Sequence, residues 1–568
     1  MEGKMQNKDF MNEYKRWLNT EGLSTDVKAE LEEIKNDETA IAERFAAPLE
    51  FGTGGMRGIL GAGIGRMNIY TVGRVSAGFA AYVAASAPDA AERGVVISHD
   101  NRRYSREFAL VTAGVFAAAG VRAYLFDSLR PTPMLSFAVR RIGAAGGVMI
   151  TASHNPPEYN GYKIYNSDGC QLDIAQSDIV IKNIAAIENP LTVPCLSLEE
   201  AGDLIRILPP ELDDEYCLRV CNISLSHDAD AAKALRVVYS PQHGTGNVPV
   251  RRVLTECGYD VVPVLSQCEP DGDFKGTKNP NPESPDAYID ALRIADEVNA
   301  DIVITTDPDC DRLGVAARRK NGEMQLITGN QSAAILLEYI LSRRTAEGTM
   351  PENPFGVTTL VTSDIGDHIC NAYGVKLEKT LTGFKYIGER IALHNAKHDA
   401  TFIFGYEESY GCLIADFVRD KDGVQASLML CEAAAYYKRL GMSLVDALDA
   451  IHAKYGFFLD TQSNFYFKGL DGSAKIAALT ANLRKNAPTE VGGMPVLRVE
   501  DYLSAETQAM GYPASDLLRF IFENGWVAVR PSGTEPKCKF YYSIKASSED
   551  EAKARLAVLK NTFEPKNA

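Results

Sequence analysis

Four short polar segments of this chain carry side chains that could do chemistry, and each follows a short apolar run. Reactive groups of α/β enzymes lie just beyond the carboxyl ends of strands, where loops can bring them together. Four such segments, each chemically different, predict one composite site built by several α/β units. They are T-A-S-H-N-P at 151–156, D-P-D-C-D-R at 307–312, G-Y-E-E-S-Y-G at 405–411 and R-P-S-G-T at 530–534.

The second segment places three carboxylates at alternate positions, Asp307, Asp309 and Asp311. A proline and the preceding apolar run favour an extended loop whose carboxylates converge on one cation. All-carboxylate ligation suits Mg²⁺ or Mn²⁺ better than zinc. A calcium EF-hand does not fit, because Arg312 stands at its sixth position and Arg318 at its twelfth. A solvated acidic turn is the alternative, but it leaves the position after a strand unexplained.

The last segment offers the donors that a phosphate group needs. Arg530 supplies a guanidinium, Ser532 and Thr534 supply hydroxyls, and Gly533 lets backbone N–H groups approach an anion. A simple turn can have the same composition. The position after an apolar run favours the phosphate interpretation.

Two further segments offer ligand contacts of opposite kinds. Glu407 and Ser409 lie two residues apart, so an extended loop puts both acceptors on one side, where they would select sugar hydroxyls. A loop cap is the alternative. The glycine-rich residues 51–58 would present Arg57 to an anion. They are not a dinucleotide-binding G-x-G-x-x-G motif, because Arg57 occupies the third glycine position.

Ser153 is the candidate reactive group of the first segment. A lone serine there could simply close a turn through its hydroxyl. A serine together with a divalent metal, a phosphate cradle and a hydroxyl-binding loop instead indicates phosphoryl transfer on a phosphorylated sugar. A serine hydrolase is disfavoured, because G-x-S-x-G is missing. The neighbour His154 also cannot easily activate the serine, since adjacent side chains of an extended backbone face opposite ways.

Length, composition and charge limit the kinds of fold that can position these segments. A chain of 568 residues with 45% hydrophobic residues predicts about three to five domains. Its formal charge of −16 argues against nucleic acid or an anionic membrane as the partner. No apolar run reaches the roughly 20 residues of a membrane span, and the start lacks the apolar stretch of a signal peptide, so we expect a cytoplasmic protein. The 11 cysteines form no C-x-x-C pair and are expected to be reduced thiols.

Apolar strand patterns alternate with helical ones along most of the chain, which indicates α/β domains with mainly parallel sheets. We expect strands near 94–98, 123–126, 235–240, 358–362 and 539–544, and helices near 105–119 and 548–562. The predicted organisation is an N-terminal helical arm (1–47) followed by four domains, at 48–225, 226–325, 326–455 and 456–568.

Together the four segments closely resemble the motifs of the α-D-phosphohexomutases, the phosphoglucomutase/phosphomannomutase family. Supporting matches are G-T-G-G-M-R-G from 52, D-N-R-R-Y-S-R-E-F from 100, N-G-Y-K from 160 and T-G-F-K from 382. The resemblance starts near residue 48 and leaves out the helical arm. It implies a heart-shaped arrangement of four domains, three of them α/β and the last a smaller sheet-and-helix domain.

The resemblance also implies a role for each candidate residue. Ser153 would carry the phosphoryl group as a phosphoserine and would contact one Mg²⁺ per chain, together with the three aspartates. Lys163 is the candidate general acid or base, or a fixed electrostatic partner, and it joins Arg57 and His154 in the predicted catalytic group. The predicted substrate contacts are Arg312, Lys385, Glu407, Ser409, Arg530, Ser532, Gly533 and Thr534.

The implied reaction passes through a bound glucose 1,6-bisphosphate, which would also act as activator. T-G-F-K, with Lys385, and the Tyr410-Gly411 ending favour glucose phosphates, while mannose and pentose phosphates remain alternatives. A haloacid-dehalogenase-type enzyme with Asp307 as nucleophile and a non-catalytic sugar-phosphate sensor are further alternatives. The expected partner is a small phosphosugar, and both a monomer and a homodimer fit.

Overall fold

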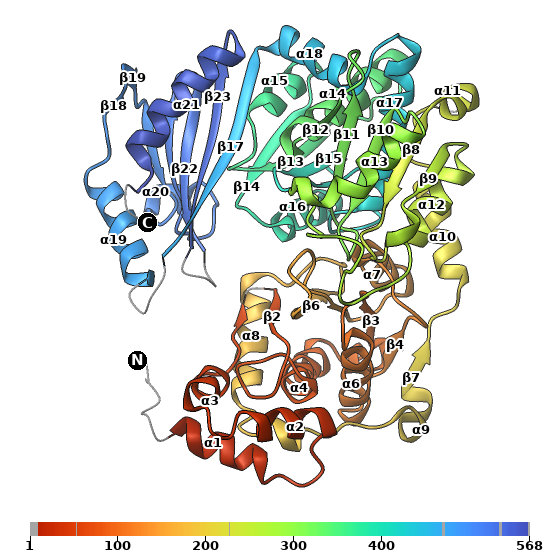
Figure 1. Ribbon diagram of the computed structural model, residues 1–568, viewed down its shortest axis with the longest axis vertical. Helices are drawn as coiled ribbons and strands as arrows, with labels where there is room; N and C mark the ends of the chain where they lie inside the picture. The colour runs from red at the N-terminus through yellow and green to blue at the C-terminus, as the bar shows by residue number, and fades with distance from the viewer. Residues whose placement is uncertain (1–8, 53, 227, 468–471, 533–536, 566–568) are drawn as a thin grey trace. The chain divides into compact units, whose positions relative to one another are not determined.

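The computed structural model describes residues 9–52, 54–226, 228–467, 472–532 and 537–565. The fold has two compact units (Figure 1). The first contains the chain up to Ala316 and the returning segment Cys412–Glu432, and the second contains Ala317–Gly411 and the chain from Ala433 onward. Each unit is described by itself below.

A seven-stranded mixed sheet forms the centre of the first α/β domain, in the order β1-β2-β6-β5-β3-β4-β7. The pairs of β3 with β4 and β5, and of β4 with β7, are parallel, whereas β6 runs antiparallel to β5 and β2. The sequence predicts mainly parallel pairing, but only half of the strand pairs in this sheet are parallel. The strands are β1 (Phe51–Gly52), β2 (Gly55–Ile59), β3 (Val95–His99), β4 (Ala123–Leu125), β5 (Gly146–Ile150), β6 (Tyr159–Asn166) and β7 (Ile205–Ile207).

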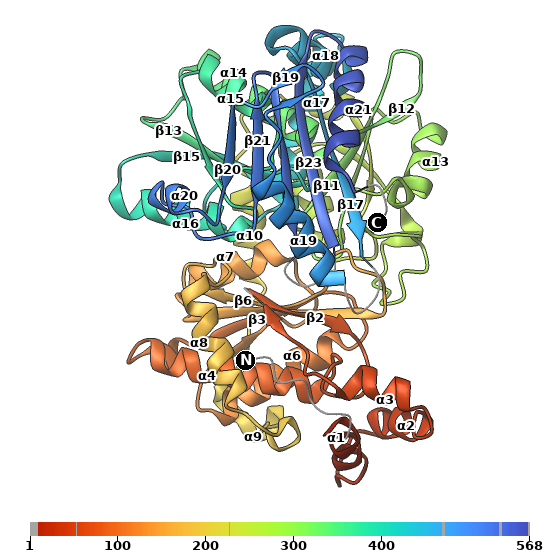
Figure 2. The ribbon, with the colours of Figure 1, turned by 90° about the vertical axis from the view of Figure 1, so that its left-hand side faces the viewer.

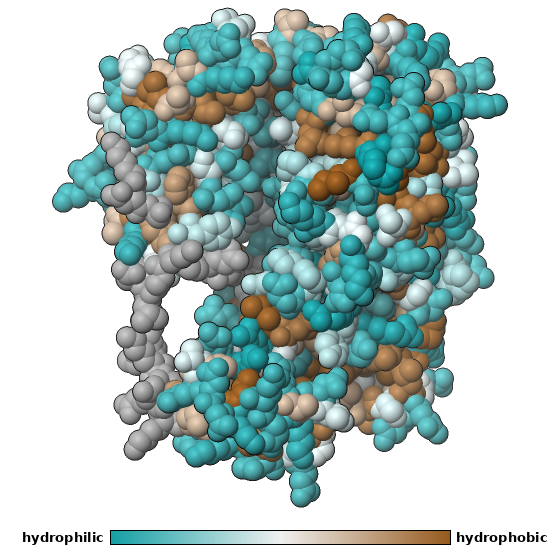
Figure 3. Space-filling view, in the orientation of Figure 1, coloured by the Kyte–Doolittle hydropathy of each residue, from teal (hydrophilic) through white to brown (hydrophobic). Residues whose placement is uncertain are grey.

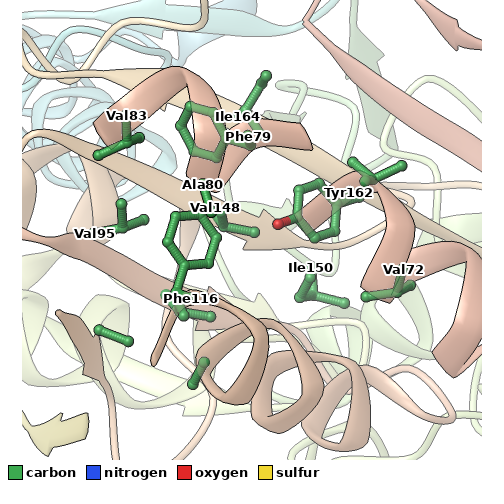
Figure 4. Close-up of a cluster of buried hydrophobic side chains, with 14 of the residues drawn as sticks. Val72, Phe79, Ala80, Val83, Val95, Phe116, Val148, Ile150, Tyr162 and Ile164 are labelled. Carbon is green, nitrogen blue, oxygen red and sulfur yellow. The ribbon is translucent and has the colours of Figure 1, made fainter. Parts of the chain in front are cut away.

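Apolar side chains from the strands and two long helices form the core of this domain. Val148 and Ile150 of β5 lie in one cluster with Phe79 of α4 (Ile69–Ser86) and Phe116 of α6 (Ser105–Ala118) (Figure 4). The α6 helix lies where the sequence predicts it. Further helices of the domain are α5 (Ala90–Arg93), α7 (Thr132–Ile142), α8 (Ile174–Ala185), α9 (Leu198–Ala201) and α10 (Glu211–Cys221).

The N-terminal arm consists of three short helices, α1 (Asp9–Leu18), α2 (Thr25–Glu33) and α3 (Glu38–Phe45). All three lie within residues 1–47, where the sequence predicts a helical arm. Trp17 is fully buried, with its ring centroid 5.7 Å from that of Phe45 and 5.4 Å from that of Tyr70. The arm and the start of the first domain therefore share one hydrophobic cluster.

The second sheet has the order β12-β11-β10-β8-β9, and β8 pairs in parallel with both β9 and β10. All five residues of β10, the strand before the three aspartates, are buried. The strands are β8 (Arg236–Ser240), β9 (Asp260–Pro263), β10 (Ile302–Thr306), β11 (Leu313–Arg318) and β12 (Met324–Ile327). Helices here are α11 (Ala229–Ala234), α12 (Asn247–Glu256), α13 (Ile289–Glu297) and, in the returning segment and beyond it, α17 (Gly423–Arg439).

The third sheet, in the second unit, has the order β14-β13-β15-β16, and β13 pairs in parallel with β14 and β15. Its strands are β13 (Pro354–Thr359), β14 (Lys376–Thr380), β15 (Thr401–Glu407) and β16 (Gly411–Leu413), with helices α14 (Gly329–Glu347), α15 (Ile365–Ala372), α16 (Phe384–Lys397) and α18 (Leu444–Tyr455). The strand predicted at 358–362 starts earlier and ends at Thr359. Leu360 and Val361 instead join a buried cluster with Trp526 and Tyr541.

The last sheet is antiparallel throughout, in the order β17-β23-β22-β21-β20. Helix α21 (Glu549–Phe563) packs against β23 and β17, and both ribbon views show it along the sheet (Figures 1 and 2). The other elements are β17 (Phe457–Tyr466), α19 (Gly472–Lys485), β18 (Glu490–Val491), β19 (Met494–Pro495), β20 (Arg498–Asp501), α20 (Ala505–Ala509), β21 (Leu518–Phe522), β22 (Gly525–Pro531) and β23 (Lys537–Ala546).

The surface and the thiols agree with the bulk composition. The face in Figure 3 is mostly hydrophilic, with apolar side chains in small groups between polar ones. Within the described ranges, no helix combines the length and the apolar character that a bilayer crossing needs. All eleven cysteines are free thiols, as predicted.

Candidate functional site

Ser153 lies in a tight loop directly after β5 and is 3% exposed. Its φ of 51° is left-handed, a conformation that costs a non-glycine residue about 1 to 3 kcal/mol. The Thr151 hydroxyl accepts the Ser153 N–H at 2.8 Å. The Ser153 hydroxyl donates to Asp307 Oδ2 at 2.6 Å. The first and second predicted segments, 154 residues apart, thus meet at one point.

His154 lies closer to the serine than the sequence argument allowed. Its Nδ1 is 3.1 Å from Ser153 Oγ, so the expectation that the two side chains face opposite ways is wrong. That expectation assumed extended backbone, whereas the left-handed Ser153 turns both side chains to one side. Burial, followed by the positive charges of Arg312 and Arg57, lowers the pKa of His154 well below its usual value. A neutral imidazole next to a hydroxyl can accept a proton.

The three aspartates form a buried group with ligand oxygens all within 4.8 Å of one another. Asp307 Oδ1 accepts the N–H groups of Asp311 and Arg312 at 3.1 and 3.0 Å, and the Thr132 hydroxyl donates to Asp309 Oδ2 at 2.9 Å. Burial, followed by the charges of Asp309 and Asp311, raises the pKa of Asp307 well above its usual value.

Two oxygens of this group, Asp309 Oδ1 and Asp311 Oδ1, are buried and have no hydrogen-bond partner in the part of the chain that the structure describes. A buried carboxylate oxygen without a partner is costly. A divalent cation held by oxygen ligands would satisfy both, and the donor set fits Mg²⁺ or Mn²⁺. The group could therefore hold a metal ion.

Two lysines neutralise part of the acidic charge. Lys163 Nζ is 2.7 Å from Asp309 Oδ2 and 3.3 Å from Asp311 Oδ2, and Lys421 Nζ is also 3.3 Å from Asp311 Oδ2. Burial lowers the pKa of Lys163, but the charges of Asp309 and Asp311 outweigh burial and raise it above its usual value. Lys163 is therefore a protonated ammonium ion in this site.

Both predicted arginines of this unit lie beside the serine and aspartate loops. Arg57 is exposed on β2 and donates to Asn155 Oδ1 at 2.7 Å. Arg312 donates to Glu283 Oε1 at 2.7 Å and lies 3.9 Å from Asp311. The pairing of Arg312 with Glu283 was not anticipated from the sequence.

The described residues among the predicted sugar and phosphate contacts lie in the second unit. Glu407 is the last residue of β15 and accepts the Gly383 N–H at 2.8 Å. Burial raises the pKa of the Tyr541 hydroxyl, the charge of Glu408 adds to the rise, and Arg530, near the end of β22, opposes it. Lys385, in the first turn of α16, is buried with its Nζ 4.9 Å from the Tyr386 ring centroid.

The remaining residues of this unit are placed less completely. Ser409 and Ser532 are half-buried, and the Ser532 N–H donates to the Lys537 carbonyl at 2.7 Å. Gly533 and Thr534 lie outside the described residues. Arg530 lies near the end of an antiparallel strand, β22, rather than in a loop beyond it.

Sequence reasoning missed three residues of the first unit that contact the predicted site. Thr132 and Lys421 bind the aspartates, and Arg102 binds the backbone of the Ser153 loop. Lys421 lies in a charged run, R-D-K-D-G at 419–423, directly before a long helix, which was the available signal. Arg102 lies in the D-N-R-R-Y-S-R-E-F segment that starts at residue 100.

Comparisons with known proteins match the parts of the chain that contain the four segments. Four domains of the phosphoglucomutase/phosphomannomutase family match: α/β/α domains I, II and III at residues 48–191, 214–322 and 328–455, and the C-terminal domain at 480–560. A phosphoglucomutase of Staphylococcus aureus strain MRSA252 is 35% identical over 524 residues, with 90% of this chain and 93% of the relative covered. One of Staphylococcus epidermidis is 38% identical over 520 residues, covering 89% and 93%.

Solved structures show the same fold at lower identity. A phosphoglucomutase/phosphomannomutase family protein from Burkholderia thailandensis is 19% identical with a TM-score of 0.67, covering 90% of this chain and 95% of the other. The phosphoglucomutase parafusin from Paramecium, in an open form, is 17% identical with a TM-score of 0.67, covering 90% and 94%.

Proposed function

Because the chain belongs to the phosphoglucomutase/phosphomannomutase family and is a phosphohexomutase, we propose that it interconverts glucose 1-phosphate and glucose 6-phosphate through a phosphorylated Ser153. The observation that carries the proposal is the 2.6 Å contact between Ser153 Oγ and Asp307. It puts a hydroxyl against a group of carboxylates that has two buried oxygens free for a metal ion. The preference for glucose is supported by relatives that are named phosphoglucomutases.

In the proposed first step, phospho-Ser153 transfers its phosphoryl group to the free hydroxyl of a hexose monophosphate. The bond from phosphorus to Ser153 Oγ breaks and a bond to the sugar oxygen forms. The sugar hydroxyl gives up its proton, and Ser153 Oγ gains one. The resulting glucose 1,6-bisphosphate turns around and returns its other phosphoryl group to Ser153. The same bisphosphate, added from solution, would phosphorylate an unmodified serine and so activate the enzyme.

Three groups could handle the protons. Asp307 Oδ2 and His154 Nδ1 are both within hydrogen-bond distance of Ser153 Oγ, so either can accept the serine proton when the phosphoryl group returns. Lys163 carries a proton and fits the role of acid or of a fixed positive charge.

The metal that fits the three aspartates is one Mg²⁺ per chain, held by Asp307, Asp309 and Asp311 with an oxygen on Ser153. When bound, it would neutralise charge on the oxygens of the transferring phosphoryl group. Arg57 and Arg312 lie close enough to add positive charge on the same loops.

Substrate recognition is assigned to the second unit. Glu407, with Ser409, would accept hydrogen bonds from sugar hydroxyls, and Lys385 would contribute a positive charge beside them. Arg530 and Ser532, with Gly533 and Thr534 of the same segment, would hold the phosphate that is not transferred. Each of the four proposed domains, 48–225, 226–325, 326–455 and 456–568, would thus supply one of the four segments.

The test is turnover of glucose 1-phosphate, mannose 1-phosphate and ribose 1-phosphate by the full chain with Mg²⁺ and catalytic glucose 1,6-bisphosphate. We expect glucose 1-phosphate to give the highest kcat/KM and the protein to carry acid-stable phosphate. Ser153→Ala should lose both activity and phosphate, while Ser128→Ala, at an exposed serine, should keep both.

Two outcomes would contradict the proposal. No isomerisation of any of the three sugar phosphates would remove the mutase function. An acid-labile phosphate that persists in Ser153→Ala and disappears in Asp307→Asn would make the aspartate the nucleophile.

A further inference from the structure

Arg102 lies in the loop between β3 and α6 of the first domain and is almost completely buried, at 3% exposure. Its two terminal nitrogens donate to four backbone carbonyls of one loop. Nη2 donates to the carbonyls of Ser153, at 2.6 Å, and Asn155, and Nη1 donates to those of Pro156, at 2.8 Å, and Tyr159, at 3.0 Å. The Ser153 loop therefore wraps around a single guanidinium group.

The remaining contacts hold the guanidinium in place. Its Nε faces Asp100 Oδ2 at 3.4 Å, and its carbon lies 5.0 Å from the ring centroid of Phe274. Asp100 Oδ1 accepts the Arg102 N–H at 2.9 Å and the Ser105 hydroxyl at 2.7 Å, which fixes the carboxylate in turn. Burying an ion pair is costly unless its donors and acceptors are well satisfied. Here most of the donors are directed at the loop that carries Ser153.

The conformation of that loop needs an external support. Ser153 is left-handed, which is unfavourable for a serine, and this conformation directs Oγ toward Asp307. The Ser153 carbonyl is bound directly by Arg102 at 2.6 Å. We propose that Arg102 is a positioning residue, which holds the Ser153 loop in the geometry in which Oγ faces the aspartates. The inference rests on the proposed phosphoserine mechanism and assigns the D-N-R-R motif a role in it.

A lysine could not replace this contact. The four carbonyls are spread along seven residues of loop, from Ser153 to Tyr159. The planar guanidinium carries five N–H donors in a fixed fork, whereas an ammonium carries three donors on one atom. Arg102→Lys therefore keeps the charge and loses part of the carbonyl set.

The experiment measures how fast Ser153 is phosphorylated by glucose 1,6-bisphosphate in a single turnover. In this step a bond forms between phosphorus and Oγ, the bond to the sugar oxygen breaks, the serine loses its proton and the sugar oxygen gains one. We expect Arg102→Lys to slow this step about 100-fold, as a small misplacement of a reacting group does. The KM for glucose 1-phosphate should change less than threefold, because the proposed substrate contacts lie in other loops.

The matched control is Arg103→Lys, in the next residue of the same motif. Arg103 is half exposed and forms an ion pair with Asp273 at 3.3 Å, so its variant should phosphorylate at the wild-type rate. A second variant, Asp100→Asn, keeps the shape and the hydrogen-bond acceptor and only loosens the guanidinium. It should slow phosphorylation about 3- to 10-fold in a protein that melts within a few degrees of wild type.

The outcomes separate this inference from the proposed function. If wild type is phosphorylated on Ser153 and Arg102→Lys and Asp100→Asn match Arg103→Lys, Arg102 has no positioning role. A parallel rise in KM and fall in kcat would also overturn it, because that indicates a general loss of structure. If wild type itself takes up no phosphate on Ser153, it is the proposed function that fails.

Discussion

At the residue scale, the site of the first unit consists of buried carboxylates and ammonium groups around the Ser153 hydroxyl. Three aspartates face two lysines, and Lys163 contacts two of the carboxylates at once. Lys163 Nζ contacts one oxygen of Asp309 and one oxygen of Asp311. The other oxygen of each carboxylate lacks a hydrogen-bond partner among the described residues. These two oxygens are therefore the ones available to a cation.

This balance predicts opposite effects of one substitution on metal binding and on activity. Lys163→Met removes a positive charge beside the aspartates, so Mg²⁺ should bind more tightly, measured by calorimetry. Without the ammonium, kcat should fall about 100-fold or more, as expected when an acid–base group is lost. Lys278→Met, at an exposed lysine paired with Asp286, should change neither quantity. Weaker Mg²⁺ binding in Lys163→Met would show that the lysine supports the metal site rather than competing with it.

At the element scale, the ends of strands position most of the candidate residues, but not all in the expected way. Ser153 and Asp307 follow buried parallel strands. Glu407 is still part of its strand, and Arg530 belongs to an antiparallel sheet. The N-terminal arm adds a support of another kind: Glu30 of α2 accepts the Ala62 N–H at 2.7 Å and pairs with Arg44 at 2.9 Å. Ala62 lies in the loop that follows β2, the strand carrying Arg57.

The arm predicts a local loss of stability when this carboxylate is removed. Glu30→Ala should lower the free energy of unfolding of the arm by about 1 to 2 kcal/mol, because it leaves a backbone donor unpaired. The chain has two tryptophans, so denaturation followed by fluorescence in a Trp526→Phe background reports on Trp17 in the arm. Glu32→Ala, on the same helix with an exposed ion pair to Lys35 at 3.6 Å, should cost less than about 0.5 kcal/mol. Equal costs for the two variants would contradict the support by Glu30.

At the scale of the whole molecule, the chain divides into two compact units, and each contains one of its two tryptophans. In the second unit, a buried cluster joins residues of the third sheet region to the last sheet, with Leu360 and Leu381 against Trp526 and Tyr541. Asp460 of β17 lies in the last sheet, opposite Ser543 of β23. Burial raises the pKa of Asp460 to about 6.

The raised pKa predicts how the second unit responds to pH. The folded state holds the Asp460 proton more tightly than the unfolded state, so this group costs no stability below its ordinary pKa of 3.8. The cost grows as pH rises from 3.8 to about 6 and then stays constant at about 3 kcal/mol. Asp460→Asn should abolish this loss and raise Tm above pH 6, read from Trp526 fluorescence in a Trp17→Phe background. Asp449→Asn, at an exposed aspartate, should show the same dependence of Tm on pH as wild type. If Asp460→Asn also matched wild type, the assignment of this effect to Asp460 would be wrong.

The sequence by itself determined the chemistry of the four segments and most of the local structure that carries them. Apolar runs and their spacing predicted α6, α21, the helical character of the N-terminal arm and the strands before Ser153 and Asp307, because these depend on neighbouring residues. Only the tertiary structure decided which segments meet. Ser153 and Asp307 are 154 residues apart, and neither the charged run around Lys421 nor the D-N-R-R segment around Arg102 shows by itself which residues it contacts. Their positions follow from strand order and packing, which brings distant residues together, and the left-handed turn at Ser153, bound by Arg102, brought His154 to the serine's side.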